Sequence, residues 1–270
     1  MPETTEFPRI TVVTPVFNAA ATIEETLRSV REQDCDNVEH VVVDGGSTDG
    51  TLEILRRSDG VRWISEPDEG RPDAVNKGVR MSSGEVVGFL NADDTYEPGT
   101  LRTISELFAR DPHAMWATGY CRIIDGDGDE IRASITSYKN VLLRHYSFPL
   151  YLTQNFVSDP ATFVRRAALD EVGPLDNRYR ISHDYDLWLR VARRWDPIVV
   201  RRNLSSFRMV EGTLSMAGFE QQFREHEEVA RLHGDGHRLP VVANAVMSRL
   251  IVASYRLMRL RRRLRSCAAG

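Results

Sequence analysis

The first 112 residues alternate between short apolar runs and amphipathic segments, and this alternation restricts the fold more than any other feature. A continuous β-branched run such as ITVVTPV at 10–16 is typical of a buried strand, whereas apolar side chains every three or four residues indicate a helix. We predict strands within 10–16, 39–51, 61–65 and 85–90, alternating with helices within 21–33, 52–57, 72–84 and 98–112. This order predicts an α/β fold with a mostly parallel central sheet and helices on both faces.

The alternation loosens after residue 112. Residues 115–125 and 130–135 flank a DGDG turn and predict a β-hairpin. Residues 184–195 predict an amphipathic helix with Trp188 on its apolar face, and we therefore assign Trp188 to the core. The remaining predictions are a strand and a short helix within 159–176, strand pairs within 197–210 and helices from 215 onward.

The end of each of the first four predicted strands carries polar side chains. They lie within 14–18, 44–49, 66–73 and 91–94. In an open parallel sheet, ligands bind outside the carboxyl ends of the strands. The pattern therefore predicts a ligand site at one edge of the sheet, formed by these segments.

The fourth strand ends in FLNADD, with Asp93 and Asp94 directly after an apolar run. Carboxylate oxygens are hard ligands that suit Mg²⁺ or Mn²⁺. The alternative is that the two acids only cap the following turn. The second strand ends in VVVDGGSTDGT, where Gly45 and Gly46 let the backbone approach a ligand closely, or where Asp49 caps the next helix. Neither segment is a dinucleotide-binding turn or a P-loop, since the chain lacks both glycine patterns.

Length, cysteines and charge limit the class of protein further. A chain of 270 residues is long enough for one large α/β domain or two small ones. Its three cysteines, Cys35, Cys121 and Cys267, are far apart and fit a reducing, cytoplasmic compartment. The polar N-terminus does not resemble a signal peptide, and no apolar stretch is long enough to span a membrane.

Five segments match a known family in order and spacing. They are TVVTPVFNAAATIEETLRSV, VVVDGGSTDGT, SEPDEGRPDAVNKG, GEVVGFLNADD and HDYDLWLRV. Over residues 8–211 the chain resembles family 2 glycosyltransferases with the GT-A fold, a Rossmann-like sheet. The resemblance implies transfer of a sugar from a nucleotide-sugar to an acceptor, usually with inversion at the anomeric carbon.

The resemblance implies a nucleotide-sugar site formed by Pro15, Phe17, Asp44, Arg71, Asp73, Lys77, Asn91, Ala92 and Asp93. In this arrangement Phe17 contacts the base and Asp44 accepts a hydrogen bond, most simply from uracil N3–H. Arg71 and Lys77 reach the diphosphate, and Asp73 contacts the nucleoside.

Residues 91–93 stand at the position of the family's DxD motif. The resemblance implies Mg²⁺ or Mn²⁺ on Asp93, while Asp94 is left open as a second ligand or as a support for Asp93. Asn91 replaces the first acid; its amide can bond a ribose hydroxyl but adds no charge to the cation. A divalent ion would stabilise the charge that develops on the diphosphate leaving group.

The acceptor side is implied by the match of His183-Asp184 to the family's ED motif, which makes Asp184 the general base. Inversion by single displacement needs one carboxylate that deprotonates the acceptor hydroxyl. Asp184 starts a predicted helix, whose dipole favours the ionised form, although it could equally be a plain N-cap. His183 replaces the usual Glu on the acceptor side and could orient the acceptor, contact a phosphate or approach the metal in place of the missing acid. The acceptor pocket also includes Ser158, Asp159 and Thr162, although Thr162 could instead only shape a turn.

The C-terminal segment is basic. Residues 241–270 hold seven arginines and no acid, which gives them a charge of +7. Because the whole chain has a net charge of −4, the first 240 residues carry −11. Within 245–265 the arginines form a stripe beside apolar residues, which predicts peripheral contact with the inner face of the cell membrane. The alternatives are packing on the domain or a homodimer seam. The acidic body argues against nucleic-acid binding.

We expect a glycosyltransferase domain over 1–211, with a nucleotide-sugar half at 1–112 and an acceptor half at 113–211, and a helical extension over 212–270. The expected function is metal-dependent, inverting transfer from a nucleotide-sugar, first of all a UDP-sugar, to a glycan or lipid-linked acceptor in polysaccharide, glycolipid or cell-envelope assembly. The rival functions are a sugar nucleotidyltransferase, whose Gly-rich loop after the first strand is missing, and a catalytically silent nucleotide- or carbohydrate-binding module.

Overall fold

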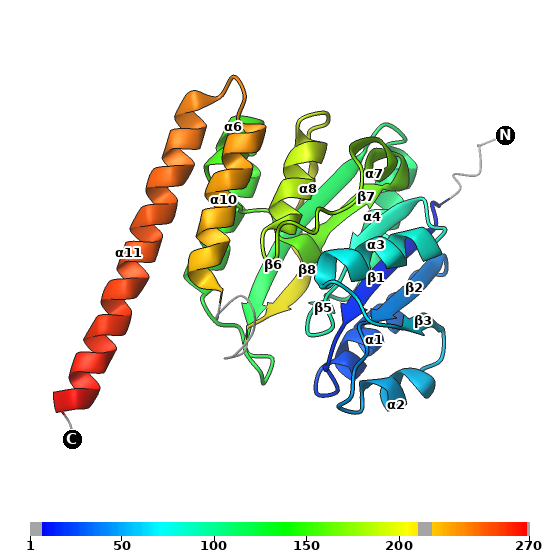
Figure 1. The fold of residues 1–270 in the computed structure, drawn as a ribbon. Coiled ribbons are helices and arrows are strands. Elements are labelled where there is room, and N and C mark those ends of the chain that lie inside the picture. The colour runs from blue at the N-terminus through cyan, green and yellow to red at the C-terminus, as the bar shows by residue number, and fades with distance from the viewer. Residues whose placement is uncertain (1–6, 210–217, 269–270) are drawn as a thin grey trace.

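The computed structural model describes residues 7–209 and 218–268 of the chain. Over these residues one eight-stranded sheet has the order β3-β2-β1-β4-β7-β6-β8-β5 (Figure 1). The strands are β1 (Ile10–Val16), β2 (Val38–Asp44), β3 (Val61–Ser65), β4 (Val86–Phe89), β5 (Thr95–Tyr96), β6 (Trp116–Ile124), β7 (Thr162–Arg165) and β8 (Ile198–Arg208). Four of the seven neighbouring pairs are parallel, which confirms the predicted α/β fold.

Helices cover both faces of the sheet. One face carries α1 (Ile23–Arg31), α2 (Thr51–Arg56) and α4 (Thr100–Arg110). The other carries α3 (Arg71–Met81), α5 (Ala133–Arg144), α6 (Phe148–Thr153), α7 (Arg166–Val172), α8 (His183–Ala192) and α10 (Phe219–His233). Side chains alternate along β1, so that Val12 packs in the first core and Val13 in the second.

The last helix, α11 (Arg238–Ala268), packs against α6 and α10 and continues beyond them, so that its C-terminal end lies away from the sheet (Figure 1). None of the described helices is both long enough and apolar enough to cross a membrane. The predicted domain boundary at residue 211 lies outside the described residues. The predicted halves 1–112 and 113–211 contribute strands to the same sheet.

The hairpin predicted around the DGDG turn is wrong. The turn forms, since Asp127 N and Asp129 N each donate to Asp125 Oδ1 at 3.0 Å, but only Ile124 and Glu130 make a β-bridge. Arg132 then adopts a left-handed φ of 54° and the chain enters α5. Pairing of this segment with β6, on the edge opposite β8, stops at Ile131 N, which donates to the Ile123 carbonyl at 2.8 Å.

Two local predictions also need correction. The strand pairs expected within 197–210 are one strand, β8, which pairs with β6 on one side and β5 on the other. The helix predicted within 72–84 ends at Met81, with Ser82 extended, so Gly84 lies outside it. Gly84 N instead donates to Thr11 Oγ1 at 2.9 Å, and a Cβ there would meet that oxygen at 2.4 Å, so glycine is required by close packing on β1.

Candidate active site

Asp44, at the end of β2, is held by the loop that follows it. Its Oδ2 accepts hydrogen bonds from Gly46 N and Ser47 N at 3.0 Å and from Ser65 Oγ at 2.7 Å. Gly46 has a φ of 91°, which a glycine adopts without strain. The other oxygen, Oδ1, is buried and has no partner among the described residues. A buried acceptor with a free lone pair is a candidate contact for a ligand donor.

The loop after β1 is tied to the loop after β2. Asn18 N donates to Ser47 Oγ at 2.7 Å, and Thr48 N donates to Asn18 Oδ1 at 2.9 Å. Phe17, just before this link, is 63% exposed, so its ring is available to a ligand, whereas Pro15 is buried within β1. Sequence analysis did not single out Asn18 or Ser47. Their only signal was their place at two neighbouring strand ends.

Asp73 and Lys77 lie one turn apart near the start of α3. Lys77 Nζ pairs with Glu66 at 2.9 Å and with Asp73 at 3.3 Å, and it also donates to the Pro67 carbonyl at 3.0 Å. These partners raise the pKa of Lys77, Glu66 first, so it stays cationic. The predicted roles of Asp73 and Lys77 toward a nucleotide stay predictions.

The buried side of the loop that follows β4 is held by Asp94. This residue is fully buried; its carboxylate accepts from Asn91 Nδ2 at 2.8 Å and from Arg208 N at 2.9 Å. Burial, and then the charge of Asp93, raise the pKa of Asp94 well above its usual range. Arg208, 3% exposed, adds a bond to the Asp93 carbonyl at 3.0 Å. Asp94 therefore supports the loop and does not face outward.

Asp93 is the acid of this loop that is free to bind a ligand. Its side chain is half-buried, and burial raises its pKa. No cluster of three or more His, Cys, Asp or Glu suited to a metal ion exists among the described residues. Mg²⁺ is commonly held by one or two carboxylates together with substrate phosphates. The residues therefore fit an ion held jointly by Asp93 and a diphosphate, and they do not form an all-protein cage.

Arg71, the first residue of α3, connects the two sides of the site. Its Nε donates to Asn91 Oδ1 at 2.6 Å, one terminal nitrogen lies 2.6 Å from His183 Nε2, and the other forms an ion pair with Asp159. The guanidinium is 20% exposed. Three sides of this planar group are thus fixed by residues from the loop after β4, from α8 and from the short η1 helix (Asp159–Ala161).

The contacts of Arg71 also explain why this chain has Asn91 and His183 where the family has acids. The Asn91 amide accepts from Arg71 and donates to Asp94, which a carboxylate at this position could not do. His183 is 5% exposed; burial and the Arg71 charge lower its pKa well below the usual range, so the ring is neutral and its Nε2 accepts. A neutral His183 therefore cannot replace the negative charge that is absent at Asn91.

Asp184 lies in the first turn of α8, where Ser182 is the N-cap, so Asp184 is not a plain cap. Its Oδ2 accepts from Asn155 Nδ2 at 3.2 Å. Burial, and then the charge of Asp159, raise the pKa of Asp184 to about 6. We expected the helix dipole to favour the ionised form of Asp184, but the desolvation of this carboxyl outweighs the dipole. A carboxyl with this pKa can accept a proton near neutral pH.

The other predicted acceptor residues separate into two kinds. Asp159 faces the network, since it also accepts from Trp188 Nε1 at 2.9 Å. Trp188 is fully buried and stacks on Trp116, as its core assignment predicted. Thr162 is fully buried and bonds the Ser158 carbonyl at 2.8 Å, which favours the turn-shaping alternative. Ala92 is likewise buried.

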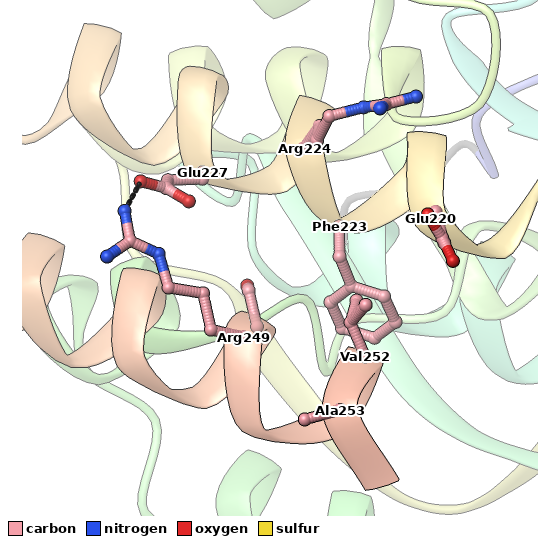
Figure 2. Close-up of a pocket in the computed structure, with 8 residues that line it drawn as sticks. Glu220, Phe223, Arg224, Glu227, Arg249, Val252 and Ala253 are labelled. Carbon is pink, nitrogen blue, oxygen red and sulfur yellow. Dashed lines mark hydrogen bonds and ion pairs between the residues drawn. The ribbon is translucent and has the colours of Figure 1, made fainter. Parts of the chain in front are cut away.

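A hollow of about 510 Å³ lies elsewhere, between α10 and α11. Figure 2 shows Glu220, Phe223, Arg224 and Glu227 on one helix facing Arg249, Val252 and Ala253 on the other. Arg249 pairs with Glu227 at 3.0 Å. The strand-end residues described above do not line it.

Comparisons with known proteins place this arrangement in context. The family model described as "Glycosyl transferase family 2" matches residues 11–173. A PGL/p-HBAD biosynthesis glycosyltransferase of Mycobacterium tuberculosis is 30% identical over 197 residues, which cover 68% of this chain and 69% of that protein. An uncharacterized glycosyltransferase of the same species is 29% identical over 210 residues, 75% and 76% of the two chains.

Solved structures share the fold. The mannosyltransferase PcManGT from Pyrobaculum calidifontis, in complex with GDP-Man and Mn²⁺, has a TM-score of 0.68 and 22% identity, covering 91% of this chain and 71% of that one. TarS 1–349 of S. aureus, in complex with UDP-GlcNAc, has a TM-score of 0.60 and 20% identity, covering 83% and 66%. At these identities the likeness extends to the fold alone.

Proposed function

The chain belongs to glycosyl transferase family 2 and is a glycosyltransferase, and on that premise we propose metal-dependent, inverting transfer of a sugar from a UDP-sugar to a hydroxyl acceptor. The proposed acceptor is a glycan or a lipid-linked sugar in polysaccharide, glycolipid or cell-envelope assembly. The proposed division assigns the donor to residues 1–112 and the acceptor to 113–211.

One observation carries the proposal. The Arg71 guanidinium contacts both Asn91, two residues before Asp93, and His183, directly before Asp184. An inverting transfer needs one carboxylate for the metal at the leaving group and another as the base. The contacts of Arg71 connect the segments that carry these two acids, Asp93 and Asp184.

Asp184 acts as the general base. It takes the proton of the acceptor hydroxyl as that oxygen forms the bond to the anomeric carbon and the bond from that carbon to the diphosphate oxygen breaks. Arg71 and Asn155 hold the site around Asp184 while its raised pKa keeps it basic enough to accept the proton. His183, neutral and bonded to Arg71, orients the first turn of α8.

Asp93 holds Mg²⁺ or Mn²⁺ together with the donor diphosphate. When bound, the ion supplies positive charge to the leaving diphosphate. The free Asp93 side chain and the rigid loop beneath it, fixed by Asp94 and Arg208, support this assignment.

Asp44 selects the base. Its Oδ1 is a buried acceptor without a partner among the described residues, which suits the N3–H of uracil. Phe17 supplies an exposed ring for base stacking, and Arg71 and Lys77 provide positive charge toward the diphosphate. Guanine also presents an N–H donor, so a GDP-sugar belongs in the test.

The test is a panel of UDP-, GDP-, CDP- and dTDP-sugars with Mg²⁺, Mn²⁺ or EDTA, read by thermal shift and by slow donor hydrolysis without acceptor. We expect a UDP-sugar to bind in the presence of metal and to hydrolyse, with Asp184→Asn as the matched inactive control. Binding of no nucleotide-sugar with either metal contradicts the proposal. Pyrophosphate exchange would indicate a nucleotidyltransferase, and binding that never leads to turnover a silent module.

Peripheral contact of residues 245–265 with an anionic membrane face on the cytoplasmic side is part of the proposal. The described start of α11 supports it, because Leu239, Val242, Val246 and Leu250 are 84, 59, 50 and 65% exposed and share one stripe. The side chains from 255 onward lie outside the described residues. Co-sedimentation with anionic but not neutral vesicles, lost in Leu250→Glu, is expected. A concentration-dependent dimer that Leu250→Glu dissociates, with no vesicle binding, would assign the stripe to a homodimer.

A further inference from the structure

We propose that Lys139 makes this enzyme selective for acceptors that carry an anionic group, a carboxylate or a phosphate, close to the hydroxyl that Asp184 deprotonates. This inference rests on the proposed glycosyl transfer and deepens it, because it assigns the acceptor a chemical class. Lys139 lies in α5, and the sequence predicted no element for this part of the chain beyond residue 135.

Lys139 lies on the inward face of α5. Thr136 and Leu143, three residues before and four after it, are buried, and Lys139 itself is partly buried. The opposite face is exposed at Ile135 and Tyr138, by 41 and 48%. A lysine would ordinarily take the solvent side of such a helix. Its inward position therefore calls for a partner.

The protein supplies only a weak partner. Lys139 Nζ contacts Ser158 Oγ at 3.3 Å, and within the described part of the chain no carboxylate forms an ion pair with it. Other partly buried cations have more partners: Arg71 pairs with Asp159, Arg208 pairs with Glu25, and Arg166 donates to two carbonyls and to Ser82 Oγ. An ammonium has three donors, so most of its hydrogen-bonding capacity is unused. Buried charges are normally paired, and an anionic ligand would complete this one.

One short loop connects Lys139 with the base. Between α6 and η1, Asn155 donates to Asp184 at 3.2 Å, and Ser158, three residues later, contacts Lys139. The Asp184 charge is near enough to act on the ammonium, although burial dominates and lowers the pKa of Lys139. The same loop thus contacts both the proposed base and the Lys139 ammonium.

A competing role is that Lys139 only adjusts the base. The main influences on Asp184 are burial, Asp159, Arg71 and Asn155, and its pKa is raised to about 6 although Lys139 is near. The two roles differ in what they predict: an acceptor contact changes selectivity between acceptors, whereas adjustment of the base moves the pH profile for all acceptors alike.

The test measures binding of acceptor sugars to the enzyme saturated with Mg²⁺ and the nucleoside diphosphate that binds it most tightly. Methyl glucuronide, methyl galacturonide, glucose 6-phosphate and galactose 6-phosphate are each compared with the neutral methyl glycoside by titration calorimetry. We expect at least one anionic sugar to bind about 10- to 100-fold more tightly than its neutral partner, the range of a charge-assisted hydrogen bond. The uronides and phosphates distinguish a carboxylate from a phosphate.

Two variants make the assignment specific. Lys139→Met should abolish the preference, whereas Arg144→Met, which removes an exposed charge from the same helix, should leave it unchanged. Nucleotide affinity and donor hydrolysis should stay at the wild-type level in both. Equal binding of all sugars by the wild type, or a preference that survives in Lys139→Met, overturns the inference. So does a fall in nucleotide affinity in Lys139→Met, which would place the lysine in the donor site. If no nucleotide binds any variant or the wild type, the failure is that of the proposed function.

Discussion

The loops after β1 and β2 and the cluster around the start of α8 are built in different ways. Asp44 is held by the backbone N–H groups of Gly46 and Ser47 and by Ser65, and Asn18 connects two neighbouring strand ends. In the α8 cluster, by contrast, Arg71 bonds His183 across 112 positions of sequence and Asp159 across 88. The hydrogen bonds of the first region join positions at most 30 apart, at the ends of neighbouring strands, whereas the Arg71 contacts to His183 and Asp159 depend on the packing of segments much more distant in sequence.

The difference matches what each region has to do. A hydrogen-bonding position for a base needs fixed geometry, which short turns provide. A proton acceptor needs a shifted pKa, which requires burial and neighbouring charge from several elements. We expect substitutions in the first region to change binding and substitutions in the second to change the rate of transfer.

The largest effect is expected for Asp184→Asn. Loss of a general base slows transfer by about 10²- to 10⁴-fold, while nucleotide-sugar binding should stay unchanged because the donor loops do not depend on Asp184. Single-turnover transfer and a separate binding titration measure the two quantities. Loss of donor binding in this variant would move Asp184 to the nucleotide site and remove the contrast between the regions.

Asp93→Ala should weaken donor binding by about 10- to 100-fold in the presence of Mg²⁺ or Mn²⁺, because a charge-assisted contact is lost. In EDTA the variant and the wild type should bind alike. Asp34→Ala, which removes an exposed acid paired with Arg102, is the control for net charge. Equal metal dependence in variant and wild type would exclude Asp93 as a ligand.

Asp44→Asn tests the base contact. Three N–H and O–H donors fix the oxygen at the Oδ2 position, so the new amide nitrogen must take the Oδ1 position. A donor there opposes uracil N3–H but suits the N3 acceptor of cytosine. The ratio of CDP to UDP affinity should rise by about tenfold, the change expected for one hydrogen bond. If both affinities fall equally, Asp44 does not contact the base.

The pH profile should show the smallest change and concerns only the second region. Because the pKa of Asp184 is raised to about 6, its carboxyl is protonated below that pH and cannot accept a proton. At saturating donor and metal, the transfer rate should fall about tenfold per pH unit below the midpoint. Asn155→Ala removes a bond that lowers this pKa, so its midpoint should move to higher pH. A flat profile between pH 5 and 7 would contradict Asp184 as the base.

Some elements could be predicted from the sequence and others could not, depending on whether the pattern that defines them is local. β1 to β4 were predictable because a parallel sheet covered on both faces leaves long apolar runs in the sequence. The segment 130–135 was not, because it pairs with β6 at one bridge only and then enters α5, whose packing against β6 no local pattern indicates. Lys139 and Asn155 were missed for the same reason: nothing in their local sequence indicates what packs over them.

The sequence alone determined the alternation of strands and helices, and with it the edge of the sheet on which the strands before Asp44 and Asp93 both end. The family followed from motifs at that same edge. Tertiary structure decided which acids are available and which are buried supports: no other described residue bonds the Asp93 side chain, whereas Asp94 is fully buried and accepts two hydrogen bonds. It also decided that Asp184 has a raised pKa, because desolvation and charge at a side chain come from elements distant in sequence, and no local pattern encodes them.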